Sequence, residues 1–96
     1  MNDKIRSTAM DQLFKAVLSL ETLEECYQFF EDVCTINELQ ALSQRLEVAG
    51  MLHNQSTYVE IAEKTGASTT TIGRVNRTLH YGNDGYKLVF EKMRKE

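Results

Sequence analysis

The sequence predicts an all-α protein of about six helices, and three observations support this fold class. The 96-residue chain contains no proline, the residue that most strongly disrupts helix interiors. Three capping boxes, each a threonine followed three residues later by a glutamate, mark helix starts at Thr22, Thr35 and Thr57. Apolar residues recur at helical spacing along most of the chain. At this length we expect a single domain, residues 1–96.

The first two helices are expected over residues 3–19 and 21–35. The first carries an apolar stripe that is wider than a lone surface helix usually has, and we expect a partner chain to bury part of it. Its members are Ile5, Ala9, Met10, Leu13, Phe14, Val17, Leu18 and Leu20. The second contains an aromatic cluster, Tyr27, Phe29 and Phe30, which is interpreted as core rather than as a ligand box.

A long third helix is expected over residues 35–53. Its predicted buried stripe consists of Ile36, Leu39, Leu42, Leu46, Ala49 and Leu52. Arg45 lies beside this stripe rather than opposite it. It is therefore either a solvated arginine or one that points into a pocket. His53 is expected to be a surface or capping side chain.

Residues 57–79 predict a helix-turn-helix. Val59, Ile61, Ala62 and Thr65 are assigned to the inner side of its first helix. Gly66 supplies the turn because glycine adopts a left-handed backbone cheaply. Ser68 or Thr69 caps the second helix, whose buried side is formed by Ile72, Val75 and Leu79. The usual use of this motif is to place its second helix in the major groove of DNA.

A last short helix follows the turn cluster at residues 81–85. Its apolar residues are Leu88, Val89, Phe90 and Met93, and its end, Lys92 to Lys95, is basic. We therefore expect residues 1–56 to be mainly dimerisation helices, residues 57–80 the helix-turn-helix, and residues 83–95 the C-terminal helix.

Charge is distributed unevenly along the chain. Residues 1–56 carry four basic and nine acidic residues, whereas residues 57–96 carry seven basic and five acidic residues. The positive excess therefore falls in the half that contains the motif, as DNA binding requires. The net charge of −3 is nevertheless a mild objection to it.

Several classes of protein are disfavoured. No apolar run approaches a membrane span and no signal peptide opens the chain, so a cytoplasmic location without membrane contact is expected. Cys26 and Cys34 lack metal-site spacing and are interpreted as reduced, buried thiols. No nucleophile–base constellation and no glycine-rich phosphate loop is present, and the chain is not expected to be an enzyme.

Residues 35–79 resemble the Trp repressor family, including its uncharacterised Trp-repressor-like branch. The pattern at Thr35, Glu38, Ala41, Leu42 and Arg45 is similar to the family's central helix. The patterns at Glu60, Ile61, Gly66 and Ala67, and at Thr71, Ile72 and Arg74, are similar to its helix-turn-helix. The resemblance implies an intertwined homodimer of six-helix chains that binds a palindrome in double-stranded DNA.

The resemblance also implies a candidate ligand site, in which Thr35, Arg45, Arg74 and Thr78 match the family's corepressor pocket. The family pattern has glycine after the second arginine, whereas this chain has Val75. A branched side chain would occupy the room that glycine leaves for a flat indole ring, at a cost of about 1–3 kcal/mol. L-tryptophan is therefore not expected to be the effector, and no cofactor is assigned.

The sequence thus favours a DNA-binding transcriptional regulator, most simply a repressor. Two alternatives stay open: a repressor gated by an amino-acid-like metabolite near Arg45 and Arg74, and a protein-interaction module that does not bind DNA. The candidate DNA-binding residues are Lys64, Ser68, Thr69, Thr70, Thr71, Gly73, Arg74 and Arg77. The three threonines could contact base edges or thymine methyl groups, and Lys64 and Arg77 phosphates. Arg74 could contact DNA or face the pocket.

Overall fold

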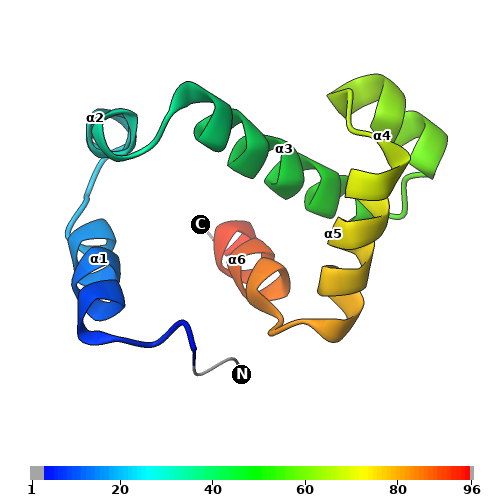
Figure 1. Cartoon of the computed structure of the whole chain (residues 1–96). Helices are drawn as coiled ribbons and strands as arrows, with labels where there is room; N and C mark the ends of the chain where they lie inside the picture. Colours follow the sequence, from blue (N-terminus) through cyan, green and yellow to red (C-terminus); the bar gives the residue numbers. More distant parts are fainter. Residues whose placement is uncertain (1–3, 96) are drawn as a thin grey trace. The chain divides into compact units, whose positions relative to one another are not determined.

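The protein folds into six α-helices, with no strand among the residues that the structure, a computed structural model, describes (4–95; Figure 1). The helices are α1 (Thr8–Leu18), α2 (Leu23–Val33), α3 (Ile36–His53), α4 (Tyr58–Thr65), α5 (Thr69–Tyr81) and α6 (Gly85–Arg94). The predicted all-α fold is confirmed. The chain divides into an N-terminal unit that ends at Leu39 and a C-terminal unit that begins at Gln40.

In the N-terminal unit, α1 begins later than the sequence suggested. Ser7 is its N-cap, and the Ser7 hydroxyl accepts a hydrogen bond from the Met10 amide at 3.0 Å. The helix therefore starts at Thr8, whereas a start at residue 3 was predicted; residue 3 itself lies outside the described range. A serine cap is a local signal that outweighs the apolar stripe on its N-terminal side.

The start of α2 follows the predicted capping box with one difference. The Thr22 hydroxyl accepts from the Glu25 amide at 3.1 Å, as expected. The Glu25 carboxylate, however, accepts from the amide of Glu21 at 2.8 Å rather than from that of Thr22. Phe29 and Phe30 make an edge-to-face pair, but Tyr27 is 58 % exposed. The aromatic cluster is therefore only partly the core that was predicted.

The apolar side chains of α1, α2 and the first half of α3 are not buried by the described chain. Neither α1 nor α2 contains a buried residue. On α3 the predicted stripe is wrong for its first half, since Ile36 is 74 % exposed and Leu42 and Leu46 are also exposed. Only the second half of α3 contributes buried side chains, at Val48 and Ala49.

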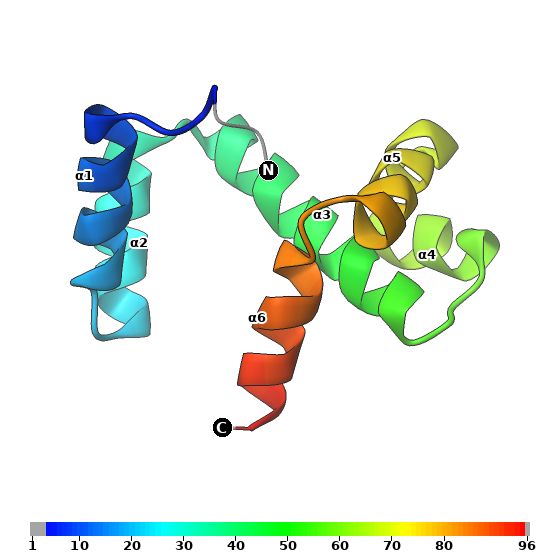
Figure 2. The ribbon, with the colours of Figure 1, turned by 90° about the horizontal axis from the view of Figure 1, so that it is seen from below.

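The C-terminal unit contains a true core. It is formed by Val48, Ala49, Ile61, Ala67, Ile72 and Val75, with Tyr86 and Phe90 of α6 packed against it. α5 contacts both α4 and α6, and Figure 2 shows α5 beside α4 and the loop that joins α5 to α6. On α4, Ile61 is fully buried as predicted, whereas Val59, assigned to the inner side, is 67 % exposed. A two-turn helix buries a narrow face, and Val59 lies off it.

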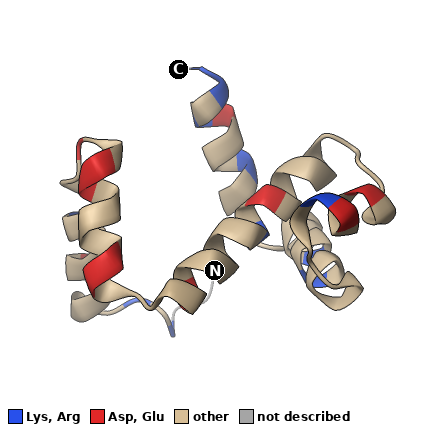
Figure 3. Ribbon diagram, turned by 90° about the horizontal axis from the view of Figure 1, so that it is seen from above, with Lys and Arg blue, Asp and Glu red and all other residues tan. Residues whose placement is uncertain are grey.

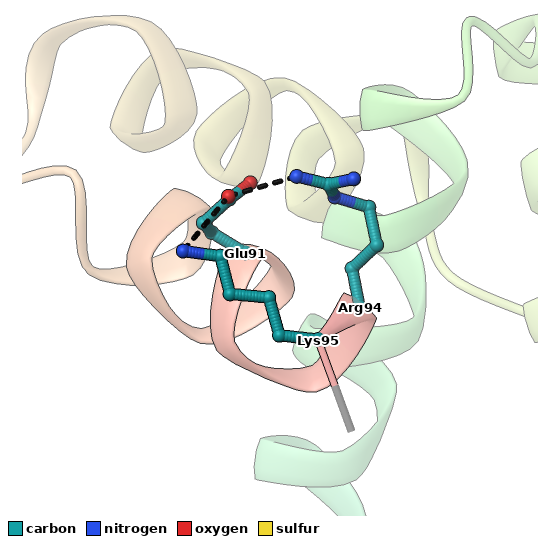
Figure 4. Close-up of polar contacts among 3 residues, drawn as sticks. All are labelled: Glu91, Arg94 and Lys95. Atoms are coloured by element: carbon teal, nitrogen blue, oxygen red, sulfur yellow. Dashed lines mark hydrogen bonds and ion pairs between the residues drawn. The ribbon is translucent and has the colours of Figure 1, made fainter.

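An open groove runs between α6 and the second half of α3. It has a volume of about 980 Å³, and its apolar wall includes Leu46, Leu88, Phe90 and Met93. The ring of His53 packs on that of Phe90, with centroids 5.4 Å apart. At its polar rim, Glu91 forms ion pairs with Arg94 at 2.8 Å and Lys95 at 3.6 Å (Figure 4).

The described residues contain no helix with the length and apolarity needed to cross a membrane. Residues 4–95 also hold no cluster of three side chains suited to binding a metal ion. Cys26 and Cys34 are free thiols of intermediate burial.

Candidate nucleic-acid interface

The helix-turn-helix begins with a complete capping box at Thr57. The Thr57 hydroxyl accepts from the Glu60 amide at 3.2 Å, and the Glu60 carboxylate accepts from the Thr57 amide at 2.8 Å. The pKa of Glu60 is lowered, chiefly by the hydrogen bond from the Thr57 backbone and secondly by the hydrogen bond from the Thr57 side chain. The same reciprocal pair at Thr35 and Glu38 begins α3 and lowers the pKa of Glu38 for the same reasons.

The turn between α4 and α5 is fixed by glycine and by two side-chain bonds. Gly66 has φ +74°, the left-handed conformation predicted for it, and its amide donates to the Ala62 carbonyl at 2.9 Å. The Thr65 hydroxyl donates to the Ile61 carbonyl at 2.8 Å and accepts from the Ala67 amide at 3.1 Å. Gln44 of α3 donates its side-chain amide to the Thr65 carbonyl at 3.1 Å, which ties the turn to the core helix.

Ser68 is the N-cap of α5, one of the two residues predicted for this role. Its hydroxyl accepts from the Thr71 amide at 3.1 Å and lies 3.2 Å from the Thr71 hydroxyl. Both side chains are thus occupied in starting the helix. The hydroxyls of Thr69 and Thr70 are exposed and have no hydrogen-bond partner among the described residues. They are the side chains at this end of α5 that are available to a ligand.

The outward side of α5 lies opposite a well-buried one. Ile72 is fully buried and Val75 and Leu79 are nearly so, as predicted. At 100° per residue, Thr70 and Arg77 fall on the opposite side, with Gly73 and Arg74 flanking them. Short polar side chains, a bare backbone position and two guanidinium groups therefore share the solvent side of this helix.

Free cations gather around the motif rather than in the N-terminal unit. Lys64, Arg74 and Arg77 are exposed, and none has an acidic partner within residues 4–95. α2, by contrast, carries four acidic residues and no basic one, whereas α5 carries two arginines and no acidic residue (Figure 3). A polyanion would therefore be attracted to α5 and repelled by α2.

Two small hollows lie beside α5 and share three lining residues, Arg45, Arg74 and Val75. The first has a volume of about 130 Å³ and is completed by Ala41, Gln44 and Thr71. The second has a volume of about 310 Å³ and is completed by Thr78 and Tyr86. No acidic side chain lines either hollow, and Arg45 has no ion-pair partner in the described chain. Arg74, whose direction the sequence left open, lines both.

Val75 forms part of both walls and is only 3 % exposed. Small-molecule sites in proteins usually measure about 300–1,000 Å³, so the first hollow falls below that range and the second at its lower end. The Val75 side chain therefore limits the room for a ligand in both hollows.

The candidate ligand residues predicted from the sequence are thus only partly brought together. Arg45, Arg74 and Thr78 line the second hollow. Thr35 belongs to the N-terminal unit, where its hydroxyl caps α3. Tyr86 was not predicted as a wall residue. Its role depends on the packing of α6 against α5, and no local sequence pattern signals that contact.

Comparison with known proteins gives consistent matches over nearly the whole chain. The family model described as Trp repressor protein matches residues 8–94. The uncharacterised protein YerC of Bacillus subtilis is 56 % identical over 93 residues, which cover 97 % of this chain and 89 % of YerC.

Two solved structures share the fold. A TrpR-like protein from Eubacterium eligens superposes with a TM-score of 0.93 at 64 % identity, covering 96 % of this chain and 95 % of that one. A structure from Staphylococcus aureus superposes with a TM-score of 0.94 at 52 % identity, covering 100 % of this chain and 97 % of that one.

Proposed function

The chain belongs to the Trp repressor family, and on that premise we propose that it is a sequence-specific DNA-binding transcriptional repressor. It acts as a dimer on a palindromic operator, with one α5 helix in the major groove of each half-site. The observation that carries the proposal is the solvent side of α5. There the hydroxyls of Thr69 and Thr70 lie beside arginines, and none of these groups has a partner within residues 4–95.

The chemistry of this surface suits DNA. Threonine offers a hydroxyl to base edges and a methyl group to thymine, and the positively charged end of α5 favours a nearby phosphate. Lys64 and Arg77 are assigned to phosphates, which position the helix without reading sequence. Binding should therefore weaken steeply as salt concentration rises, because each neutralised phosphate releases a counterion.

The second subunit is proposed from the exposed apolar surface. Leu18, Leu23 and Ile36 are each more than 70 % exposed, and the α3–α6 groove has an apolar wall. A chain of this size cannot leave so much apolar surface in water and remain stable and monodisperse. In the proposed dimer, the exposed apolar side chains of α1, α2 and α3 of one subunit pack against the apolar wall of the α3–α6 groove of the other.

The deciding experiment is selection of duplexes from a random DNA library by the purified protein at low salt, followed by sequencing. The expected result is an inverted repeat whose half-sites lie about one helical turn apart, because two α5 helices of a two-fold dimer reach successive major grooves. Recovery of unrelated sequences would contradict sequence-specific binding. Failure to retain any duplex would favour the protein-interaction module.

A metabolite-gated repressor is the second candidate, and the shared arginine wall of the two hollows favours it. Arg45 and Arg74 present two cationic groups that have no acidic partner among the described residues, as a site for a small carboxylate would. Thermal denaturation in the presence of single amino acids and related carboxylates separates the two candidates, since a ligand of the folded state raises the melting temperature. L-tryptophan is expected to give no shift because the Val75 side chain, which lines both hollows, occupies room that an indole ring would need.

A further inference from the structure

Gly73 occupies a position of α5 at which the described chain does not require a glycine. A Cβ atom built on it would meet no heavy atom within 4 Å, its chain neighbours and the helix's own backbone left aside. Its backbone is right-handed helical, unlike that of Gly66, which has φ +74°. A glycine inside a helix lowers stability relative to alanine. The reason for this glycine must therefore lie outside the subunit.

The position of Gly73 indicates what that reason is. It follows Thr69 and Thr70 by one turn, precedes Arg77 by one turn, and is partly exposed. The buried residues Ile72 and Val75 are on the other side of the helix. Gly73 therefore interrupts, with a bare stretch of backbone, the same surface that carries the candidate DNA contacts.

We infer that Gly73 is the point of closest approach between α5 and DNA, and that it sets how deeply α5 enters the major groove. This inference rests on the proposed DNA-binding function. The major groove is about 12 Å wide and a helix with its side chains is about 10–12 Å across, so one absent side chain changes how the helix fits. Threonine side chains are short. Thr69 and Thr70 reach base edges only if the backbone itself comes close.

The inference separates specific from non-specific binding. Contacts to phosphates depend on long, flexible side chains such as those of Arg77 and Lys64. These side chains still reach the DNA phosphates if α5 moves outward from the groove. Base contacts by Thr69 and Thr70 do not survive such a movement. A side chain at position 73 should therefore reduce sequence discrimination more than overall attraction to DNA.

The test compares Gly73→Ala and Gly73→Leu with the wild type on two duplexes: one recovered from a random library by the wild-type protein, and a scrambled duplex of the same composition. Gly73→Ala should raise the melting temperature by about 2–8 °C, because alanine is the better helix former and meets no neighbour. It should weaken binding to the recovered duplex about tenfold and Gly73→Leu about a hundredfold. Binding to the scrambled duplex should change less than about twofold.

Gly85→Ala is the matched control. Gly85 is the first residue of α6, and a Cβ there also meets nothing within 4 Å. The same chemical change at this site should leave affinity for both duplexes unaltered.

Three results would overturn the inference. The first is wild-type affinity of Gly73→Ala for the recovered duplex, and the second is an equal loss on both duplexes. The third is a loss that accompanies dissociation into monomers by sedimentation, which would assign the glycine to a subunit contact. If the wild-type protein recovers no duplex at all, the proposed function fails and the inference fails with it. That outcome is distinct from the other three.

Discussion

Thr70 is the residue whose change tests the interface most directly. Its hydroxyl is exposed, has no partner in the described chain and lies opposite the buried side of α5. Thr70→Glu places a carboxylate where the negatively charged groove would lie, so we expect loss of about 100-fold or more in affinity for a recovered operator. Fluorescence anisotropy measures this loss, and circular dichroism should show an unchanged helix content.

Gln28→Glu is the control for this prediction. Gln28 is exposed on α2, and the change adds the same single negative charge. Binding should weaken far less than with Thr70→Glu. Equal losses would show that net charge, and not the α5 surface, governs binding.

Gly66 gives the opposite result to Gly73 under the same substitution. At φ +74° an alanine must adopt a left-handed backbone, although no neighbouring atom obstructs its side chain. Gly66→Ala should therefore lower the free energy of unfolding by about 1–2 kcal/mol. Urea denaturation followed by circular dichroism measures the change. A stability equal to that of the wild type would contradict the strained turn.

At the scale of the element, the capping box of α4 makes stability depend on acid. The pKa of Glu60 is lowered in the folded protein, so its ionised form is favoured by folding. This contribution is complete above the ordinary pKa of glutamate and is lost as pH falls through the lowered pKa. Compared with Glu60→Gln, the wild type should be more stable at neutral pH, and the difference should vanish in acid. Melting temperatures measured from pH 7 into acid test this; a difference that does not shrink as pH falls below the ordinary pKa of glutamate would contradict it.

Helix starts were predictable because their signals are local. A threonine and a glutamate three residues apart predicted the starts of α3 and α4 correctly, and the only inputs were neighbours in the sequence. The start of α1 was predicted wrongly because the apolar stripe extends to Ile5, on the N-terminal side of the serine cap at Ser7, where the helix begins. Val59 was misplaced because two turns of helix give too short a pattern to locate the buried face.

The candidate site was predictable where it depends on helical periodicity and not where it depends on tertiary packing. The outward side of α5 followed from the spacing of Ile72, Val75 and Leu79. The wall that Tyr86 contributes and the bond from Gln44 to the turn join segments far apart in the sequence. No feature of a single sequence indicates which distant side chains meet.

At the scale of the whole molecule, the exposed apolar surface predicts that the folded species is a dimer. Light scattering should give twice the 11.0 kDa chain mass, and the melting temperature should rise with protein concentration. Leu88 lines the α3–α6 groove and is 57 % exposed. Leu88→Asp places a charge in the proposed subunit contact and should produce monomers of much lower stability.

Val59→Asp provides the comparison. Val59 is more exposed than Leu88, at 67 %, but lies on α4, outside the groove. This variant should stay dimeric. If both variants stay dimeric, the groove is not a subunit contact.

The exposed stripes of α1, α2 and α3 have a consequence for genetics. If each chain must pair to cover them, a newly made subunit joins whichever partner is present. The two α5 helices of a dimer then always act together on DNA. A Thr70→Glu subunit retains all of these stripes and so pairs normally. Made in excess in a cell that also makes the normal protein, it should capture normal subunits in dimers with one defective half. The mutant allele would therefore be dominant, whereas a Leu88→Asp allele, unable to pair, would be recessive.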